Sequence, residues 1–125
     1  MIKKEEFDAY RVIVESQETR ETLAGMNPDA ISKLGGDMSV YYARLSNELA
    51  LVKDEIMAEF MVLVADPGDG SKPMAAARAD KEAELNVNTR HPVSRRQIEY
   101  LMEGIDKIAF ACSARVRSFS KEGNF

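Results

Sequence analysis

Two groups of acidic residues have the spacing of a metal-dependent hydrolytic site. Residues 15–21 contain two overlapping ExxE strings, and Glu103 with Asp106 forms an ExxD pair. Such pairs on neighbouring helices supply carboxylates that can hold Mg²⁺ for metal-assisted hydrolysis. Here more than 80 residues separate the two groups, and Glu103 is followed by Lys107 at the i, i+4 spacing of a solvated helix surface. The pattern therefore favours exposed helix faces over a metal site.

The remaining side chains that could do chemistry lack partners in the sequence. His91 is the single histidine, and no Ser, Cys or Asp stands at a spacing typical of nucleophilic catalysis. Cys112 lies in an apolar pattern, as small buried cysteines do. No glycine-rich phosphate loop follows a strand, and no Cys/His spacing fits a metal site. We therefore expect no catalytic residues, no metal, no cofactor and no enzymatic activity.

Positive charge gathers toward the carboxyl end of the chain. Residues 1–89 carry ten Lys and Arg against seventeen Asp and Glu, whereas residues 90–125 carry seven against four. Most of the basic residues there form two clusters, first Arg90, Arg95 and Arg96, then Arg115, Arg117 and Lys121. The second cluster can be explained by the favourable placement of cations at a helix carboxyl terminus. The alternative is a surface that tracks a polyanion, with Tyr100 and Phe119 available for stacking.

Hydrophobic spacing predicts an all-α protein whose first part is a helical arm. Residues 3–24 have the apolar periodicity of one amphipathic helix. Asn27 and the proline after it form an N-cap pattern that opens a short helix, which we expect Gly35 and Gly36 to interrupt. We therefore predict an arm over residues 1–36, joined to the body by a hinge.

The body begins with a long helix that Asp37 is expected to cap and that ends near Ala65. Its apolar residues step by three or four and form one seam. They are Tyr42, Leu45, Leu49, Val52, Ile56, Phe60 and Leu63. Residues 66–70 are turn formers that stop the helix. Residues 72–85 are strong helix formers with few large apolar side chains, so we expect an exposed or mobile helix there.

The last helix begins at a capping-box pattern formed by Ser94 and Gln97. Its seam again steps by three or four, through Ile98, Leu101, Ile105, Ile108, Cys112, Val116 and Phe119. We expect this helix to pair with the one ending near Ala65, giving an elongated helical hairpin over residues 37–125. The arm and the hairpin form a single folding unit.

The two seams are broader than two paired helices can cover, so either the amino-terminal helices or other copies of the chain must bury the remainder. Of the two, we favour assembly into a homo-oligomer. The residues expected at the interface between copies are Leu45, Leu49, Val52, Ile56, Ile105, Ile108, Val116 and Phe119. With 125 residues, of which 45% are apolar, the chain has the size and composition of one globular domain.

The composition also predicts where the protein acts. A single cysteine excludes an internal disulfide and is typical of a reducing compartment. No apolar run approaches the roughly 18 residues of a membrane helix, and the first residues lack a signal-peptide core. We therefore expect a cytoplasmic protein with no membrane contact, in the host bacterial cytoplasm if a phage encodes it.

Two segments of the chain resemble a known family. The stretch YARLSNELALVKDEI, residues 42–56, is similar to the first long helix of the phage recombination mediator UvsY family. The stretch IEYLMEGIDKIAFACSARVRS, residues 98–118, is similar to that family's carboxyl-terminal helix, with an aromatic opening, a Cys and Ser pair and closing basic residues. The GDG turn at residues 68–70 sits where the family places one. Together these segments cover about half of the chain.

The resemblance implies a ring-forming, non-enzymatic accessory protein that binds single-stranded DNA, displaces the single-strand-binding protein and loads a RecA-like recombinase. The chain departs from the family in one place, because residues 60–70 contain no cation where the family has a basic cluster. Arg44 and Lys53 match the family in type, and Arg115 and Arg117 correspond loosely to its closing basic residues. The expected DNA-binding residues are Arg115, Arg117, Lys121, Arg95, Arg96, Arg44 and Lys53.

A second hypothesis belongs to a different class. The acidic first 89 residues or the broad apolar seam could form the interface of a helical protein–protein interaction module without DNA binding. A phage assembly chaperone or an inhibitor of a host factor would fit that description. Salt-sensitive binding of an oligonucleotide separates the two hypotheses.

Overall fold

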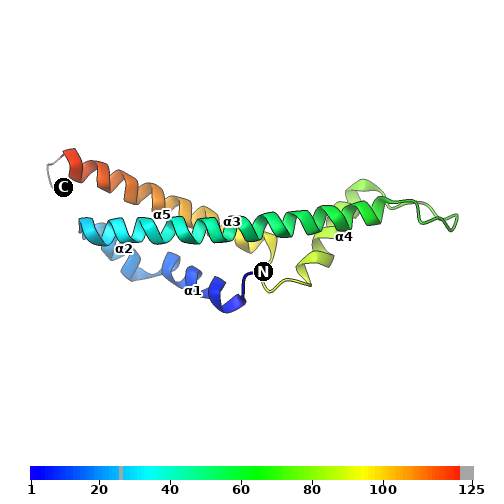
Figure 1. Cartoon of the computed structure of the whole chain (residues 1–125), viewed down its shortest axis with the longest axis horizontal. Coiled ribbons are helices and arrows are strands. Elements are labelled where there is room, and N and C mark those ends of the chain that lie inside the picture. The colour runs from blue at the N-terminus through cyan, green and yellow to red at the C-terminus, as the bar shows by residue number, and fades with distance from the viewer. Residues whose placement is uncertain (26, 122–125) are drawn as a thin grey trace.

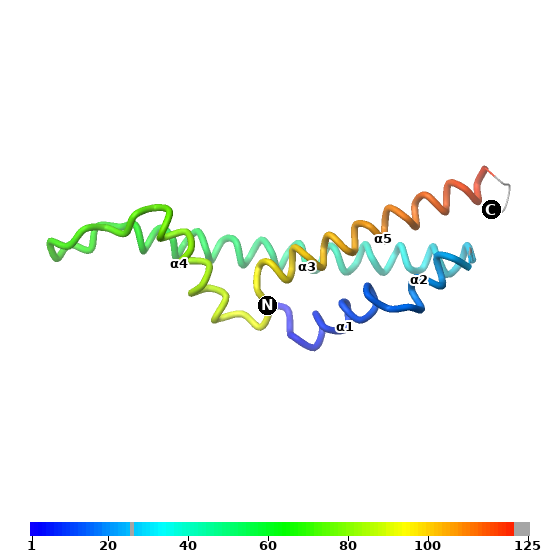
Figure 2. The backbone as a smooth tube through the Cα atoms, turned by 180° about the vertical axis from the view of Figure 1, so that it is seen from behind, coloured from blue at the N-terminus to red at the C-terminus, as the bar shows by residue number. Residues whose placement is uncertain are grey.

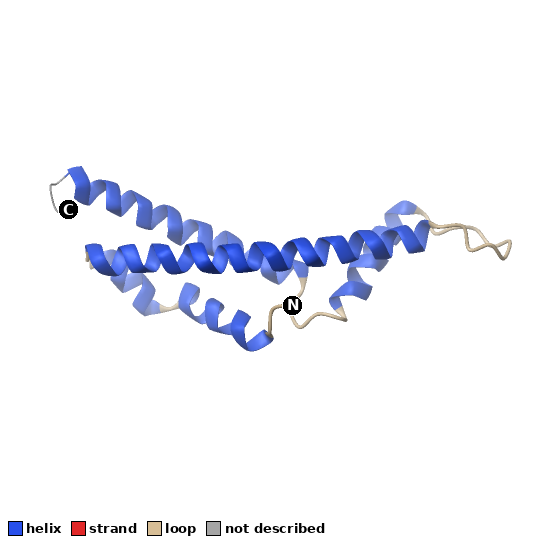
Figure 3. Ribbon diagram, viewed as in Figure 1, coloured by secondary structure: helices blue, strands red, loops and turns tan. Residues whose placement is uncertain are grey.

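The computed structural model describes residues 1–25 and 27–121, which form five α-helices and no strand. The helices make an elongated bundle, much longer than it is wide (Figure 3). The predicted all-α class, with a helical hairpin and an amino-terminal helical arm, is confirmed. Within these residues, none of the helices has both the length and the apolar character needed to cross a membrane.

One long helix organises the molecule. Helix α3 (Pro28–Val64) has 37 residues and therefore spans about 55 Å from the usual helical rise. Helices α4 (Ala76–Asn88) and α5 (Arg95–Lys121) return along it in succession, α4 beside its second half and α5 beside its first half (Figure 1). The hairpin therefore has one continuous side and one side made of two helices.

The expected break at Gly35 and Gly36 is wrong, because α3 runs through both glycines. A Cβ built on Gly35 would lie 3.6 Å from the Cβ of Cys112 on α5, so packing in this region holds the two helices close together. Asn27 caps α3 with its side-chain oxygen, which accepts the amide of Ala30 at 3.2 Å, whereas Asp37 lies inside the helix. The expected boundary between residues 36 and 37 therefore falls within a single helix.

The amino-terminal arm consists of two helices where one was expected, α1 (Lys4–Glu15) and α2 (Gln17–Ala24). Ser16 separates them, because its backbone is extended and its side chain caps the second helix by accepting the amide of Thr19 at 3.1 Å. The arm packs back against α3 and α5, below the hairpin in Figure 2. The rings of Tyr10 and Tyr41 stack there with centroids 4.1 Å apart.

The core follows a seven-residue repeat on α3. Ile31, Met38, Leu45 and Val52 are each fully buried and lie seven residues apart, which keeps one edge of the helix against its neighbours. The facing residues on α5 are Ile98, Leu101, Met102, Ile105, Cys112 and Phe119. This single cluster also takes in Ile2, Phe7, Val87 and Val93, so the arm and the hairpin share one core.

Helix α4 covers most of the segment expected to be an exposed helix, and within residues 72–85 it buries little, as expected. The buried side chains of that segment are two alanines, Ala79 and Ala83, whereas most of its residues are exposed. Ala79, Ala83 and Val87 have no exposed surface and repeat every four residues along the side that faces α3. The helix therefore packs along α3 through a narrow row of residues.

The predicted stop signal after α3 and the predicted start signal before α5 are confirmed. In the turn after α3, Asp66 accepts the amide of Gly68 at 3.0 Å, and Gly68 and Gly70 have φ of 76° and 86°. Before α5, Gln97 accepts the amide of Ser94 at 2.9 Å, and Ser94 accepts the amide of Gln97 at 3.3 Å. This reciprocal pair is the capping box that the sequence predicts.

Candidate nucleic-acid interface

Two of the seven expected DNA-binding cations are held by carboxylates of the same chain. Arg44 donates two hydrogen bonds to Glu6 on α1, at 2.6 and 3.0 Å, and this pair fastens the arm to α3. Hydrogen bonds from Arg44 and Tyr10 lower the pKa of Glu6 from 4.5 to about 2. Arg95 is paired with Glu99 one turn later on α5, at 3.0 Å. The charge of both arginines is therefore largely neutralised on the surface.

Arg115 is turned toward the protein as well. Its guanidinium lies 5.4 Å from the centre of the Phe119 ring, within the range of a cation–π contact. Its Nε is buried and has no hydrogen-bond partner among the described residues. Phe119 is only 4% exposed, so its expected role in stacking on bases is wrong. Both side chains therefore stabilise the end of the α3–α5 pair.

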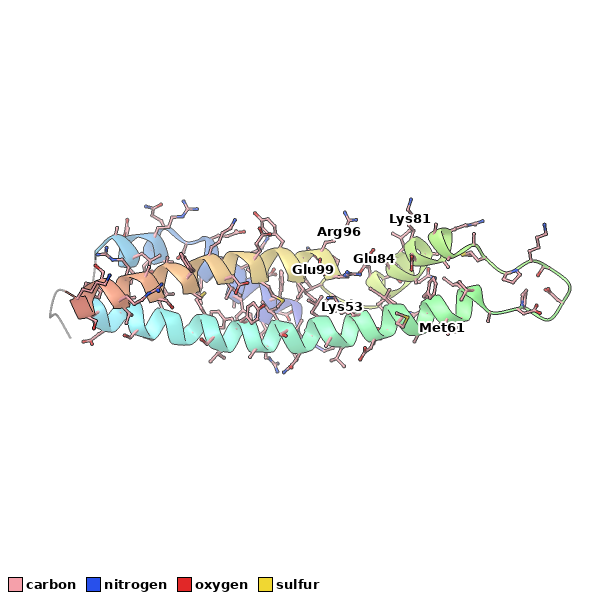
Figure 4. The ribbon with its side chains drawn as sticks, turned by 90° about the horizontal axis from the view of Figure 1, so that it is seen from above. Lys53, Met61, Lys81, Glu84, Arg96 and Glu99 are labelled. Carbon is pink, nitrogen blue, oxygen red and sulfur yellow. The ribbon has the colours of Figure 1, made fainter. Side chains whose placement is uncertain are left out.

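The other four expected cations, Lys53, Arg96, Arg117 and Lys121, are exposed, and none of them forms an ion pair in the part of the chain that the structure describes. Lys53 and Arg96 lie where the start of α5 meets the middle of α3, and the side chain of Arg96 points away from the helices (Figure 4). Arg117 and Lys121 lie one turn apart near the end of α5. The free cations therefore form two separate groups.

The second half of α5 has the strongest positive character. From Lys107 to Lys121 the helix carries four cations and no carboxylate, a net charge of +4. Lys107, Arg117 and Lys121 are exposed and separated by ten and four residues, about 2.8 and 1.1 helical turns, so they lie within about 80° of one another around the helix. We call these three residues the α5 basic stripe. Lys107 was not among the expected residues, and its only ion pair in the described chain is a loose 3.9 Å contact with exposed Glu103.

The residues expected between copies lie in the core of a single chain. Leu45, Val52, Ile105 and Phe119 are buried, and Leu49, Ile56, Ile108 and Val116 are half-buried and pack against that core. The apolar residues that remain exposed on α3 are others, among them Val40, Leu51, Met57, Met61 and Val62. Met61 extends from α3 away from α4 in Figure 4. A contact between copies would use this outer face.

Glu48 and His91 form a buried polar junction that the sequence reasoning missed. Glu48 is 4% exposed and accepts the amide of Ile2 at 2.9 Å. The His91 side chain, 2% exposed, places Nδ1 3.5 Å from Glu48 and Nε2 2.5 Å from Glu55. Nearby, Arg90 and Asn86 donate to Glu59 and lower its pKa. The junction ties the first residues and the α4–α5 loop to the middle of α3.

The side chains that could support catalysis lie in different parts of the described structure. Cys112 is buried, and burial raises the pKa of its thiol, as expected of a structural cysteine. Glu15 and Glu103 line one cavity of about 400 Å³ between the arm and α5, although they are distant in sequence. Arg20 and Lys107 line the same cavity, and the described residues contain no cluster of three or more metal-binding side chains.

Comparison of the chain with models of protein families, with curated proteins and with solved structures found no match. The two segments that resemble the UvsY family, residues 42–56 and 98–118, lie on α3 and α5. These two helices make the most extensive helix–helix contact in the described chain. We therefore infer the function from the surface of these two helices.

Proposed function

We propose that this protein is a non-enzymatic recombination mediator that binds single-stranded DNA as a homo-oligomer and helps to load a RecA-like recombinase. The observation that supports this proposal is the α5 basic stripe, Lys107, Arg117 and Lys121, exposed on a helical segment without carboxylates. Cations on one surface attract the phosphate backbone and release its counterions, whatever the base sequence. Such binding needs no catalytic residue and no cofactor.

The length of the stripe fits several successive phosphates. Lys107 and Lys121 are 14 residues apart, which corresponds to about 21 Å along α5. Three cations give only weak affinity at physiological salt, so a single chain would hold DNA poorly. Several copies on one strand multiply these contacts through effective concentration, and this is the reason for proposing a homo-oligomer.

The rest of the chain suits contacts with proteins. Residues 1–89 have a net charge of −7, from ten cations and seventeen carboxylates, and repel DNA. We assign contacts with the recombinase and the single-strand-binding protein to this acidic part. This assignment rests on the resemblance of α3 and α5 to the UvsY family.

The test is a titration of a fluorescent single-stranded oligonucleotide at several salt concentrations. In the wild type we expect affinity that falls steeply with salt. The variant Arg117→Ala/Lys121→Ala removes two phosphate contacts and lowers the slope of log K against log salt by about 1.4. The matched control, Arg78→Ala/Lys81→Ala, removes two exposed cations from α4 and leaves the slope unchanged. Native mass with and without a short strand then measures the number of copies.

The second candidate is a helical protein–protein interaction module, such as an assembly chaperone or an inhibitor of a host factor. The exposed apolar face of α3, with Leu51, Met57 and Met61, favours it, because surface apolar groups of this kind mark contact sites. This module is supported if the protein binds no oligonucleotide at physiological salt and if Met57→Ser/Met61→Ser loses binding to the partner protein.

In the DNA titration, the slope of log K against log salt could fall equally in Arg117→Ala/Lys121→Ala and in Arg78→Ala/Lys81→Ala. That result would contradict the assignment of DNA binding to α5.

A further inference from the structure

Phe110 is the most exposed large apolar side chain in the second half of α5. Its residue is 71% exposed, whereas Ile105 and Cys112 on the same helix are 1% and 3% exposed. Phe110 falls between the buried positions of the helix, so its side chain belongs to the outer face. The fold therefore gains no core packing from this ring.

We infer that Phe110 is a base-stacking residue that makes the interface selective for single strands. Lys107 precedes it by three residues and Arg117 follows it by seven, so both lie on the same side of the helix, about 5 and 11 Å along its axis. An aromatic ring between two cations can hold an unpaired base on its face while the neighbouring phosphates meet the cations. In a duplex the bases are already stacked and cannot reach the ring.

The surroundings of Phe110 favour a nucleobase over a protein partner. The exposed residues one turn away on α5 are Asp106, Lys107, Ser113 and Ala114, which are charged, polar or small. A protein-docking site of useful affinity has an apolar patch around its central aromatic anchor. Phe110 has no such patch on its own helix, but it has a cation on each side along the helix.

This inference rests on the proposed function, because it adds base recognition to a surface assigned to single-stranded DNA. The free energy of stacking on one aromatic ring corresponds to roughly 5-fold to 100-fold in affinity. We therefore expect Phe110→Ala to weaken single-strand binding within that range. The salt dependence of strand binding stays unchanged in this variant, because the number of phosphate contacts is the same.

Tryptophan fluorescence tests the contact directly, because the chain contains no tryptophan. In Phe110→Trp, an oligothymidine strand should quench the single fluorophore in step with binding. The matched control is Leu85→Trp, a residue 63% exposed on α4, whose fluorescence should stay constant. Circular dichroism verifies that both variants keep the helical content of the wild type.

Two further variants separate stacking from apolar contact. Phe110→Tyr keeps an aromatic face and retains affinity, whereas Phe110→Leu keeps apolar bulk and loses as much affinity as Phe110→Ala. Either of two results overturns the stacking inference and leaves the proposed DNA binding unaffected. The first is that Phe110→Leu binds the strand as tightly as the wild type. The second is that the strand binds to Phe110→Trp without quenching its fluorescence. If the wild type binds no strand at all, the proposed function itself fails.

Discussion

The variant Glu48→Ala tests whether the buried junction of Glu48 and His91 stabilises the fold. In Glu48→Ala the amide of Ile2 loses its 2.9 Å acceptor, and His91 loses the carboxylate that lies 3.5 Å from Nδ1. Glu48 is 4% exposed, so both groups are removed from bulk water and lose free energy when the carboxylate is absent. The variant therefore leaves two polar groups buried without one of their partners.

The expected loss of stability follows from these two contacts. A hydrogen bond to a charged group is worth about 1.5–3 kcal/mol. Because Glu48→Ala also removes the carboxylate that lies 3.5 Å from Nδ1 of His91, we take the upper end of this range, about 3 kcal/mol. For a domain of this size the melting temperature then falls by about 12 °C.

Urea unfolding followed by far-UV circular dichroism measures this loss. Glu48→Gln retains an acceptor for Ile2 and is expected to lie between the wild type and Glu48→Ala. The matched control is Asp54→Ala, an exposed carboxylate on the same helix, expected within about 0.5 kcal/mol of the wild type. If Glu48→Ala were no less stable than this control, the junction would contribute nothing and the reasoning would be refuted.

Three other predictions concern an ion pair, a core residue and a helix cap that stabilise the bundle. The pKa of Glu6 is held at about 2, below its ordinary 4.5, so its contribution is complete above pH 4.5 and is lost as the pH falls toward 2. Urea unfolding of wild type and Glu6→Gln should therefore differ near neutral pH and converge near pH 2. Leu45→Ala opens a cavity at a fully buried position and costs about 2–5 kcal/mol in the same urea unfolding; a cost no greater than that of Asp54→Ala would contradict its place in the core. Ser94→Ala removes half of the capping box and costs about 1 kcal/mol, and hydrogen exchange should show a faster amide at Gln97.

The architecture was predictable where one local pattern determines the structure. The seam of α5 and the capping box at Ser94 depend on neighbours within a few residues, and both are found as expected. The Gly35–Gly36 pair failed as a break signal, because the cost of about 1 kcal/mol for a helical glycine is outweighed by the packing of α3 on α5, where Gly35 lies against Cys112. A tertiary contact determines the structure at these glycines, and such contacts cannot be predicted from the local sequence.

The candidate interface was predictable in its region and only partly in its residues. Charge counting identifies the carboxyl-terminal third, and the exposed α5 basic stripe lies there. No local pattern indicates that Arg44 would meet Glu6, 38 residues away, or that Arg115 would lie over Phe119. Phe110 could have been found, because it falls off the three-and-four spacing of the seam and an off-seam aromatic on an amphipathic helix is exposed.

The buried junction also has a signal in the sequence, although it is a subtle one. Glu48 lies three residues after Leu45 and four before Val52, both fully buried, so it occupies a position of the seven-residue repeat that faces the core. A carboxylate at such a position must find a partner inside the protein. The chain has one histidine, in the loop before α5, and a helix reversal near residue 66 brings that loop back to the middle of α3. A charged residue on a core position is therefore the place to look for a long-range polar contact.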